Sequence, residues 1–171
     1  MGKDGTFTLT GVTTGRWRLI VSGGPYVKAL TIGARDASPY GFDLAPGTAG
    51  PIRVLASTKT GQVQAAVSAA AGGQAINFLL VPADPERLDS GLVRTSSAGS
   101  GHTTLYGVVP GRYRLFAFDA PHSGNLQELT EVLGALEAHA QLVEVGEGQT
   151  VQATAEPIEA DQLKEALEEA Q

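Results

Sequence analysis

The sequence predicts a mainly β protein made of two tandem β-sandwiches, the first incomplete, with one inserted helix near residues 125–138 and a short C-terminal helix. Three observations lead to this fold class. The composition combines 22 glycines and 9 prolines with 42% hydrophobic and 18% charged residues, a mixture typical of short strands joined by tight turns. Hydrophobic residues alternate with polar ones in several short runs, the period of a half-buried strand. One segment of the chain also occurs twice.

The duplicated segment is the strongest pattern in the sequence. Residues 4–23 read DGTFTLTGVTTGRWRLIVSG, and residues 100–119 read SGHTTLYGVVPGRYRLFAFD. The two align without a gap, so that Gly11 matches Gly107 and Trp17 matches Tyr113. A long internal match of this kind indicates repeated structural units. We therefore interpret the chain as two copies of one sandwich-sized domain.

Each copy of the segment is predicted to form a β-hairpin. In the first copy Phe7 and Leu9 alternate with threonines, and a glycine-bounded turn follows at residues 11–15. Proline and glycine in the equivalent turn at residues 107–111 suit early and positive-φ turn positions. The second strand then places its aromatic residue, Trp17 or Tyr113, toward the core. The alternating arginines face solvent, where charge discourages edge-to-edge aggregation; they are Arg16, Arg18, Arg112 and Arg114.

The remaining elements follow from short β-rich runs separated by glycine or proline. Strands are expected at residues 26–32, 52–56, 62–67, 75–81, 91–95, 141–145 and 150–155. Leucines at helical spacing predict the helix at 125–138, and Leu163 and Leu167 form a narrow apolar stripe in the last segment. The predicted domains are residues 1–57 (a partial first sandwich repeat), 58–158 (a complete second repeat) and 159–171 (a helical tail).

The two copies differ in what precedes them. The second copy has the strand-like stretch Gly61–Gly99 ahead of its duplicated segment, whereas the first copy has almost nothing ahead of its own. A sandwich without those strands exposes apolar faces and unpaired edges. Three interpretations stay open: these residues are a piece of a longer chain, a neighbouring chain supplies the strands, or the remaining strands pack on the second copy.

The duplicated segment resembles the carboxypeptidase regulatory-like domain, a transthyretin-like (prealbumin-like) or immunoglobulin-like β-sandwich. The resemblance rests on Asp4–Phe7, Gly11, Gly15 and Trp17–Leu19 in the first copy and on Leu105, Gly107–Val108, Pro110–Gly111 and Tyr113–Leu115 in the second. Thr14 stands where the pattern has proline, and Ser100–Thr103 stands where the pattern has an Asp/Asn-Gly turn followed by an aromatic residue. The resemblance implies a repeat of an exported bacterial protein, extracellular or in the cell envelope, with any export signal outside these residues. It implies nothing about chemistry.

We expect no catalytic, cofactor-binding or metal-binding residues. The chain has no cysteine, which excludes thiolate chemistry. His102, His122 and His139 lack the spacing of zinc ligands. Ser96, Ser97 and Ser100 are predicted in turns and lack the G-x-S-x-G context of a nucleophile.

The favoured function is therefore a non-catalytic structural or interaction module, which spaces domains or docks a partner through a β-sheet edge. One alternative is a carbohydrate- or cell-wall-binding module that uses Tyr26, Tyr40 and Tyr106. A further alternative is a self-assembling subunit that exchanges strands, a homo-oligomer built through the incomplete first repeat. The expected partners are neighbouring domains of the parent protein or another chain. A net charge of −6 argues against nucleic acid, and no apolar run is long enough for direct membrane insertion.

Overall fold

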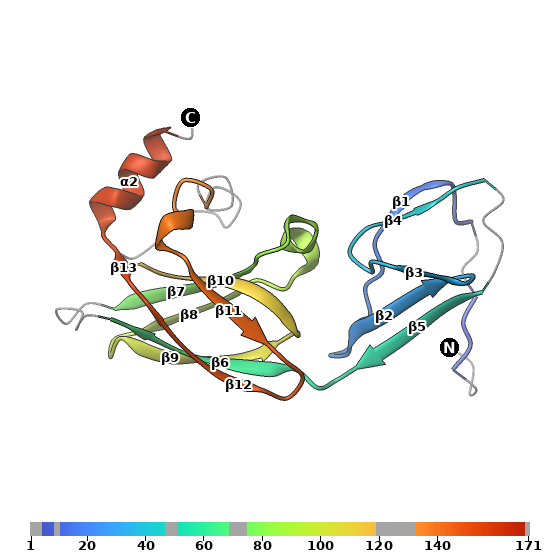
Figure 1. The fold of residues 1–171 in the computed structure, drawn as a ribbon, viewed down its shortest axis with the longest axis horizontal. Helices are drawn as coiled ribbons and strands as arrows, with labels where there is room; N and C mark the ends of the chain where they lie inside the picture. Colours follow the sequence, from blue (N-terminus) through green and yellow to red (C-terminus); the bar gives the residue numbers. More distant parts are fainter. Residues whose placement is uncertain (1–4, 9–10, 47–50, 69–74, 119–132, 170–171) are drawn as a thin grey trace. The chain divides into compact units, whose positions relative to one another are not determined.

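The computed structural model describes residues 5–8, 11–46, 51–68, 75–118 and 133–169. The chain divides into two compact units, Met1–Thr58 (unit 1) and Lys59–Gln171 (unit 2). Strands dominate the described part of both units, as the sequence predicts (Figure 1).

Unit 2 is a two-layer β-structure. One sheet has the order β12-β6-β9 and the other the order β11-β10-β7-β8. Strand β12 pairs with β6 in parallel, and a short strand, β13, pairs with β10 in parallel; the other pairs are antiparallel. The strands are β6 (Gly61–Val67), β7 (Ile76–Pro82), β8 (Arg94–Ala98), β9 (His102–Val108), β10 (Gly111–Phe118), β11 (Gln141–Val145), β12 (Thr150–Ala155) and β13 (Pro157–Ile158).

The main core lies between these two sheets. Its largest side chains come from the central strands β7 and β10, and small residues of β6 and β12 close it from the opposite sheet. The members include Val63, Ala65, Phe78, Leu80, Leu105, Tyr113, Leu115, Val145 and Ala153. Alternate residues of each strand supply this core, which is why the period-two pattern located the strands.

A second hydrophobic cluster covers the outer face of the β7–β10 sheet. Leu79 and Phe116 point into it, and Leu163 and Ala166 of helix α2 (Ala160–Glu169) pack against them. The rings of Phe116 and Phe118 stack with their centroids 6.3 Å apart. Because the middle of β7 and the second half of β10 are thus buried on both faces, Phe78–Val81 and Leu115–Phe118 are continuous apolar runs rather than alternating ones.

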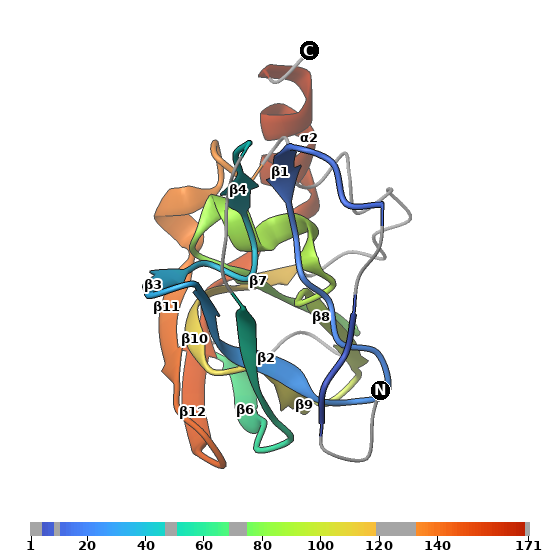
Figure 2. The same ribbon diagram turned by 90° about the vertical axis from the view of Figure 1, so that its right-hand side faces the viewer.

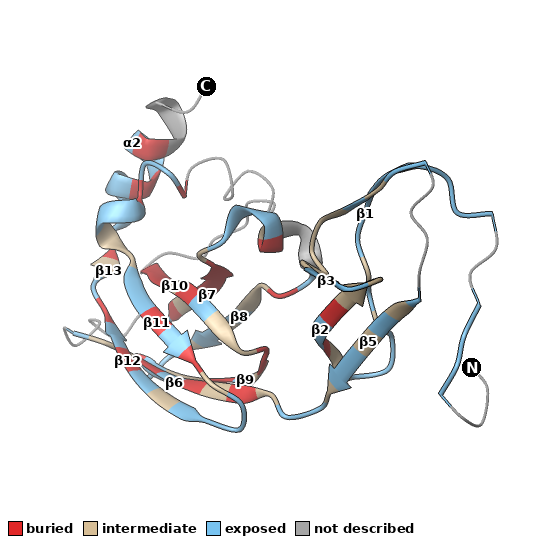
Figure 3. Ribbon diagram, turned by 45° about the vertical axis from the view of Figure 1, so that its right-hand side comes forward, coloured by how far each residue is buried: buried red, intermediate tan, exposed pale blue. Residues whose placement is uncertain are grey.

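The described residues of unit 1 form two small sheets. Strand β1 (Gly15–Trp17) pairs with β4 (Phe42–Leu44), and β2 (Tyr26–Ile32) lies between β3 (Arg35–Ala37) and β5 (Ile52–Ser57) (Figure 2). Among the described residues of unit 1, Val27 and Leu30 are the buried hydrophobic ones. Unit 2 has many more buried residues than unit 1. Figure 3 shows these buried residues in the strands of unit 2, whereas β5 of unit 1 is mostly exposed.

Most predicted strands occur where the sequence places them, at β2, β5, β6, β7, β11 and β12. The strand expected at 91–95 is displaced to β8, so Ser96 and Ser97 are strand residues and their prediction as turn residues is wrong. Strands β3 and β4 were not predicted, since three-residue strands among glycines and prolines carry no periodic signal.

The predicted hairpin is wrong in both copies. Strands β9 and β10 belong to opposite sheets, and β10 pairs with β7 and β11 instead. Val108, the last residue of β9, and Val109 after it are buried, so the chain passes here from one sheet to the other rather than forming a hairpin turn at the surface. In unit 1, residues 5–8 form no strand, and β1 pairs with β4. A short glycine-containing connection does not by itself distinguish a hairpin from such a crossing.

Of the two predicted helices, the C-terminal one is confirmed as an α-helix, whereas the described part of the other is not α-helical. Residues 125–132 of the first lie outside the described part of the chain, and residues 133–139 form turns and a 3-10 helix, η2 (Glu137–His139), rather than an α-helix. The C-terminal helix is confirmed as α2, and Leu163 of its predicted stripe is buried against the sheet.

Candidate functional site

The most specific local structure in unit 2 is an aromatic corner where the chain passes from β9 to β10. Tyr113 is fully buried, and its hydroxyl donates a hydrogen bond of 2.6 Å to the carbonyl oxygen of Val109. The guanidinium of Arg87, in the 3-10 helix η1 (Pro85–Ser90), donates to the carbonyl oxygen of Pro110 at 3.1 Å. Its central carbon lies 5.6 Å from the centroid of the Tyr113 ring, a cation–π arrangement. A tyrosine bonded back to the crossing loop is a known stabiliser of β-sandwiches.

Glycine makes this corner feasible. Gly111 has a φ of 152°, and a Cβ atom there would collide with the Arg87 guanidinium. Only glycine combines that backbone angle with the space for the arginine. Sequence reasoning found Tyr113 and Gly111 but missed Arg87, which carries no motif and is brought to the corner by the fold.

Unit 1 contains the same local geometry around Trp17. The indole Nε1 of Trp17 donates a 3.0 Å hydrogen bond to the carbonyl oxygen of Thr13, and Thr13 is the residue that aligns with Val109. The glycines of the two copies also adopt matching positive φ angles. They are 79° and 70° at Gly5 and Gly101, 72° and 66° at Gly11 and Gly107, and 141° and 152° at Gly15 and Gly111.

The register of the following strand matches as well. In unit 1, Gly15 pairs with Leu44 and Trp17 with Phe42. In unit 2, Gly111 pairs with Val145 and Tyr113 with Val143. Strand β1 therefore pairs with β4 in the same antiparallel register in which β10 pairs with β11.

The surroundings of the two corners differ. We expected Trp17 in a core, and this is wrong, because the residue is 38% exposed whereas Tyr113 is inaccessible. Val12 and Ile20 are 41% and 68% exposed, whereas the aligned Val108 and Phe116 are fully buried. We call the three exposed residues Val12, Trp17 and Ile20 the β1 surface.

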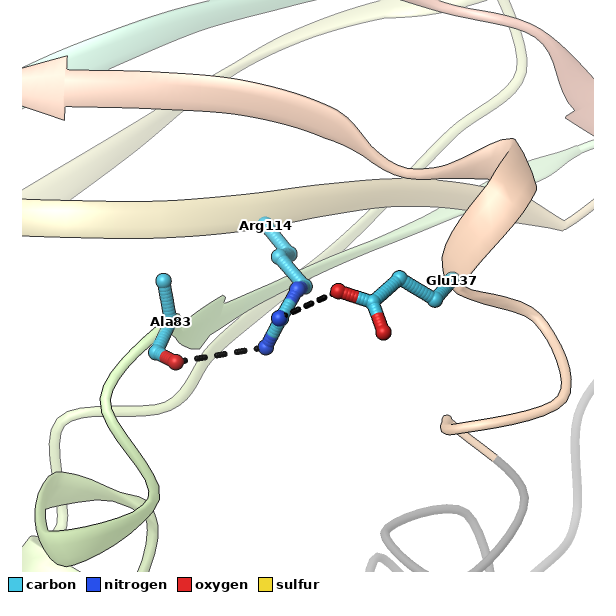
Figure 4. Close-up of polar contacts among 3 residues, drawn as sticks. All are labelled: Ala83, Arg114 and Glu137. Atoms are coloured by element: carbon cyan, nitrogen blue, oxygen red, sulfur yellow. Dashed lines mark hydrogen bonds and ion pairs between the residues drawn. The ribbon is translucent and has the colours of Figure 1, made fainter.

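Three of the four arginines predicted to face solvent are exposed, and one is not. Arg16, Arg18 and Arg112 are exposed as predicted, but Arg114 is half-buried. Its guanidinium donates to the carbonyl oxygen of Ala83 at 3.3 Å and forms an ion pair with Glu137 of η2 (Figure 4). Arg114 therefore connects β10 to two neighbouring loops, a structural role that the spacing of the arginines did not indicate.

The three tyrosines proposed for glycan contact do not gather in one unit. Tyr106 lies on β9 of unit 2 and is 69% exposed. Tyr26 and Tyr40 belong to unit 1 and are half-buried, and the backbone carbonyl of Tyr40 accepts a hydrogen bond from Arg18 Nε at 3.3 Å. Only Tyr106 therefore presents a widely accessible ring.

The candidate polar residues are dispersed. His102 is exposed on β9 with its Nδ1 atom 3.1 Å from the Ser100 carbonyl oxygen, His139 is half-buried in η2, and His122 lies outside the described residues. The hydroxyl of Ser96 is 2.8 Å from that of Thr103, so it links β8 to β9. Within the described ranges, no three histidines or acidic residues come together as a metal site.

No model of a known protein family matches the chain, and no curated protein matches it. In the part of the chain that the structure describes, no helix is long and apolar enough to cross a membrane. The proposed function therefore starts from the comparison of Trp17 in unit 1 with Tyr113 in unit 2 and of the residues around them.

Proposed function

We propose that the protein is a non-catalytic structural or interaction module that docks a partner polypeptide through the β1 surface of unit 1. The observation that carries the proposal is the contrast between β1 and β10. In the described residues β1 has one strand partner, β4, and the β1 surface is open, whereas β10 lies between two strands with the aligned residues buried. Exposed apolar side chains grouped beside a strand favour the docking of a partner polypeptide.

We also propose, from the duplicated segment, that both units are copies of a carboxypeptidase regulatory-like, transthyretin-like sandwich of an exported bacterial protein. The matching glycine angles, aromatic corners and strand registers support this interpretation. In such a protein the compact core of unit 2 acts as a rigid spacer. Unit 1 then provides the surface that binds.

Photo-crosslinking in the source cells tests the docking function. A photoreactive residue at position 20 is expected to give a discrete adduct with another polypeptide. The matched control is position 142, because Leu142 is also an exposed apolar strand residue, 57% accessible, but lies in unit 2. A lack of adduct at position 20, or the same adducts at both positions, would contradict the proposal. Turnover of any substrate that is lost on His102→Ala or Ser96→Ala would contradict its non-catalytic part.

The exposure of Tyr106 favours carbohydrate binding as a second candidate function, because stacking on a sugar needs an accessible ring. A glycan array distinguishes the two. A hit that disappears in Tyr106→Ala and persists in Tyr26→Ala would favour this alternative over docking through β1.

A further inference from the structure

We infer that the outer face of the sheet β12-β6-β9 in unit 2 binds an uncharged polysaccharide. Its sugar rings would stack on Tyr106, and its hydroxyl groups would bond to side chains of the sheet. This inference rests on the carbohydrate-binding candidate and specifies its site and ligand class. We call the outward residues of the three strands the polar face. They are Gln62, Gln64 and Ala66 of β6, His102, Thr104 and Tyr106 of β9, and Thr150, Gln152 and Thr154 of β12.

The strand register sets these side chains in rows across the sheet, which is the lower layer of unit 2 in Figure 1. In the central row, Gln64 lies between Gln152 and Thr104. Alternate residues of the same strands, such as Val63 and Ala153, are buried in the main core behind the row. Neighbouring strands are evenly spaced, so a row across three strands is about 10 Å wide. The polar face is therefore the solvent side of a packed sheet, which holds its side chains in defined positions.

A β-bulge presents Tyr106 on this face. The pairing of β6 with β9 shifts register beside Tyr106. Leu105 and Val108 on either side of it are both buried, whereas Tyr106 is 69% exposed. The guanidinium of Arg94 in β8 donates to the carbonyl oxygen of Gly107 at 2.9 Å, which fixes the backbone at the bulge. Bulges re-aim side chains beside functional sites, and an accessible tyrosine ring is a surface on which a sugar can stack.

The polar face lacks formal charge. None of its residues is Asp, Glu, Lys or Arg, although β9 and β12 are the outer strands of their sheet, where charged side chains usually prevent aggregation. The other sheet does carry charges on its outer side, where Arg112 pairs with Glu144. No lysine or arginine of the polar face is present to hold a carboxylate or sulfate group, and a net charge of −6 repels polyanions. An uncharged ligand therefore fits this face best.

The polar groups of this face suit a ligand rich in hydroxyl groups. Glutamine amides and threonine hydroxyls both donate and accept hydrogen bonds, as sugar hydroxyls do. The amide of Gln62 is oriented by a 2.8 Å hydrogen bond from its Nε2 atom to the Thr150 hydroxyl. The core of a protein interface is mainly apolar, whereas Tyr106 is the single large apolar side chain of the polar face. The observations therefore favour a sugar over a polypeptide here.

Affinity electrophoresis of the full chain tests the inference. Native gels contain hydroxyethylcellulose, xyloglucan or galactomannan as neutral probes, and polygalacturonate as the acidic one. We expect at least one neutral polymer to retard the chain and polygalacturonate to leave its mobility unchanged. With the retarding polymer, Tyr106→Ala should weaken binding by about tenfold or more. Tyr106→Phe keeps the ring and should retain most of the binding.

The matched pair of variants is Gln64→Glu and Gln141→Glu. Both add one negative charge at an exposed strand glutamine of unit 2, but Gln141 lies on β11, outside the polar face. Gln64→Glu should weaken binding by about tenfold, because a carboxylate cannot donate to a sugar hydroxyl. Gln141→Glu should bind as the parent chain does. The urea midpoints of both variants should equal that of the parent chain, because both side chains are exposed.

Three outcomes would overturn the inference: no retardation by any of the neutral polymers, equal retardation by polygalacturonate, or equal effects of Gln64→Glu and Gln141→Glu. Loss of binding in Tyr106→Ala with full binding in Gln64→Glu would retain the carbohydrate-binding candidate and remove the polar face as its site. The cross-link at position 20 concerns unit 1, so a failure of docking through the β1 surface is distinguishable from a failure here.

Discussion

The hydroxyl of Tyr113 offers a sharp test of the corner in unit 2. In Tyr113→Phe the ring keeps its volume, but the buried 2.6 Å hydrogen bond to the Val109 carbonyl is lost. Because Tyr113 is inaccessible and Val109 is 6% exposed, water cannot replace the hydroxyl without entering the core. Losing such a bond and leaving its acceptor unpaired costs about 1–2 kcal/mol.

The matched control is Trp17→Phe, which removes the equivalent hydrogen bond to Thr13 in unit 1. Both partners of that bond are exposed, so water replaces the indole donor and the cost should stay below about 0.5 kcal/mol. Hydrogen exchange resolved by strand measures the two effects separately, which avoids assuming a single transition for a chain of two units. A Tyr113→Phe cost equal to or smaller than the Trp17→Phe cost would refute the assignment of the corner as a buried stabilising element.

Three further predictions concern unit 2. Gly61→Ala should destabilise it by about 1–3 kcal/mol, because the added Cβ would lie 2.5 Å from a Val145 methyl carbon; Gly99→Ala, with open space around its Cβ, should change the urea midpoint little. A double-mutant cycle of Arg114→Met and Glu137→Gln should give a coupling of about 0.2–1 kcal/mol that weakens with salt, since the two side chains are 29% and 61% exposed; a larger, salt-independent value would contradict this. Leu163→Ala should speed exchange throughout α2 while β7 and β10 stay protected, and equal loss of protection in all three would show that the helix is not a separate layer.

The Arg114 and Arg87 contacts show how the same residue type acquires different roles. Arg112 and Arg16 extend from their strands into solvent, as alternation along a strand predicts. Arg114 shares that face but meets Glu137 and the Ala83 carbonyl because η2 and the end of β7 lie there. Arg87 is almost completely buried against Tyr113. Neither contact can be inferred from spacing, because each joins residues more than twenty positions apart.

The sequence by itself determined the local elements. The period-two pattern located β2, β11 and β12, the leucine and alanine stripe located α2, and the duplicated glycines and aromatics marked two equivalent corners. These features depend on backbone angles and on neighbours a few residues away, which the sequence states directly.

Only the tertiary structure decided which strands pair and which side chains are buried. It separated β9 from β10 into opposite sheets, buried β7 and β10 on both faces, and left Trp17 exposed while Tyr113 was enclosed. The two aromatic residues have matching local sequences and matching backbone geometry, so their different exposure arises from the strands, and in unit 2 also the 3-10 helix η1, packed around them. Burial depends on distant segments, and similar local patterns therefore gave a closed core in one unit and an accessible surface in the other.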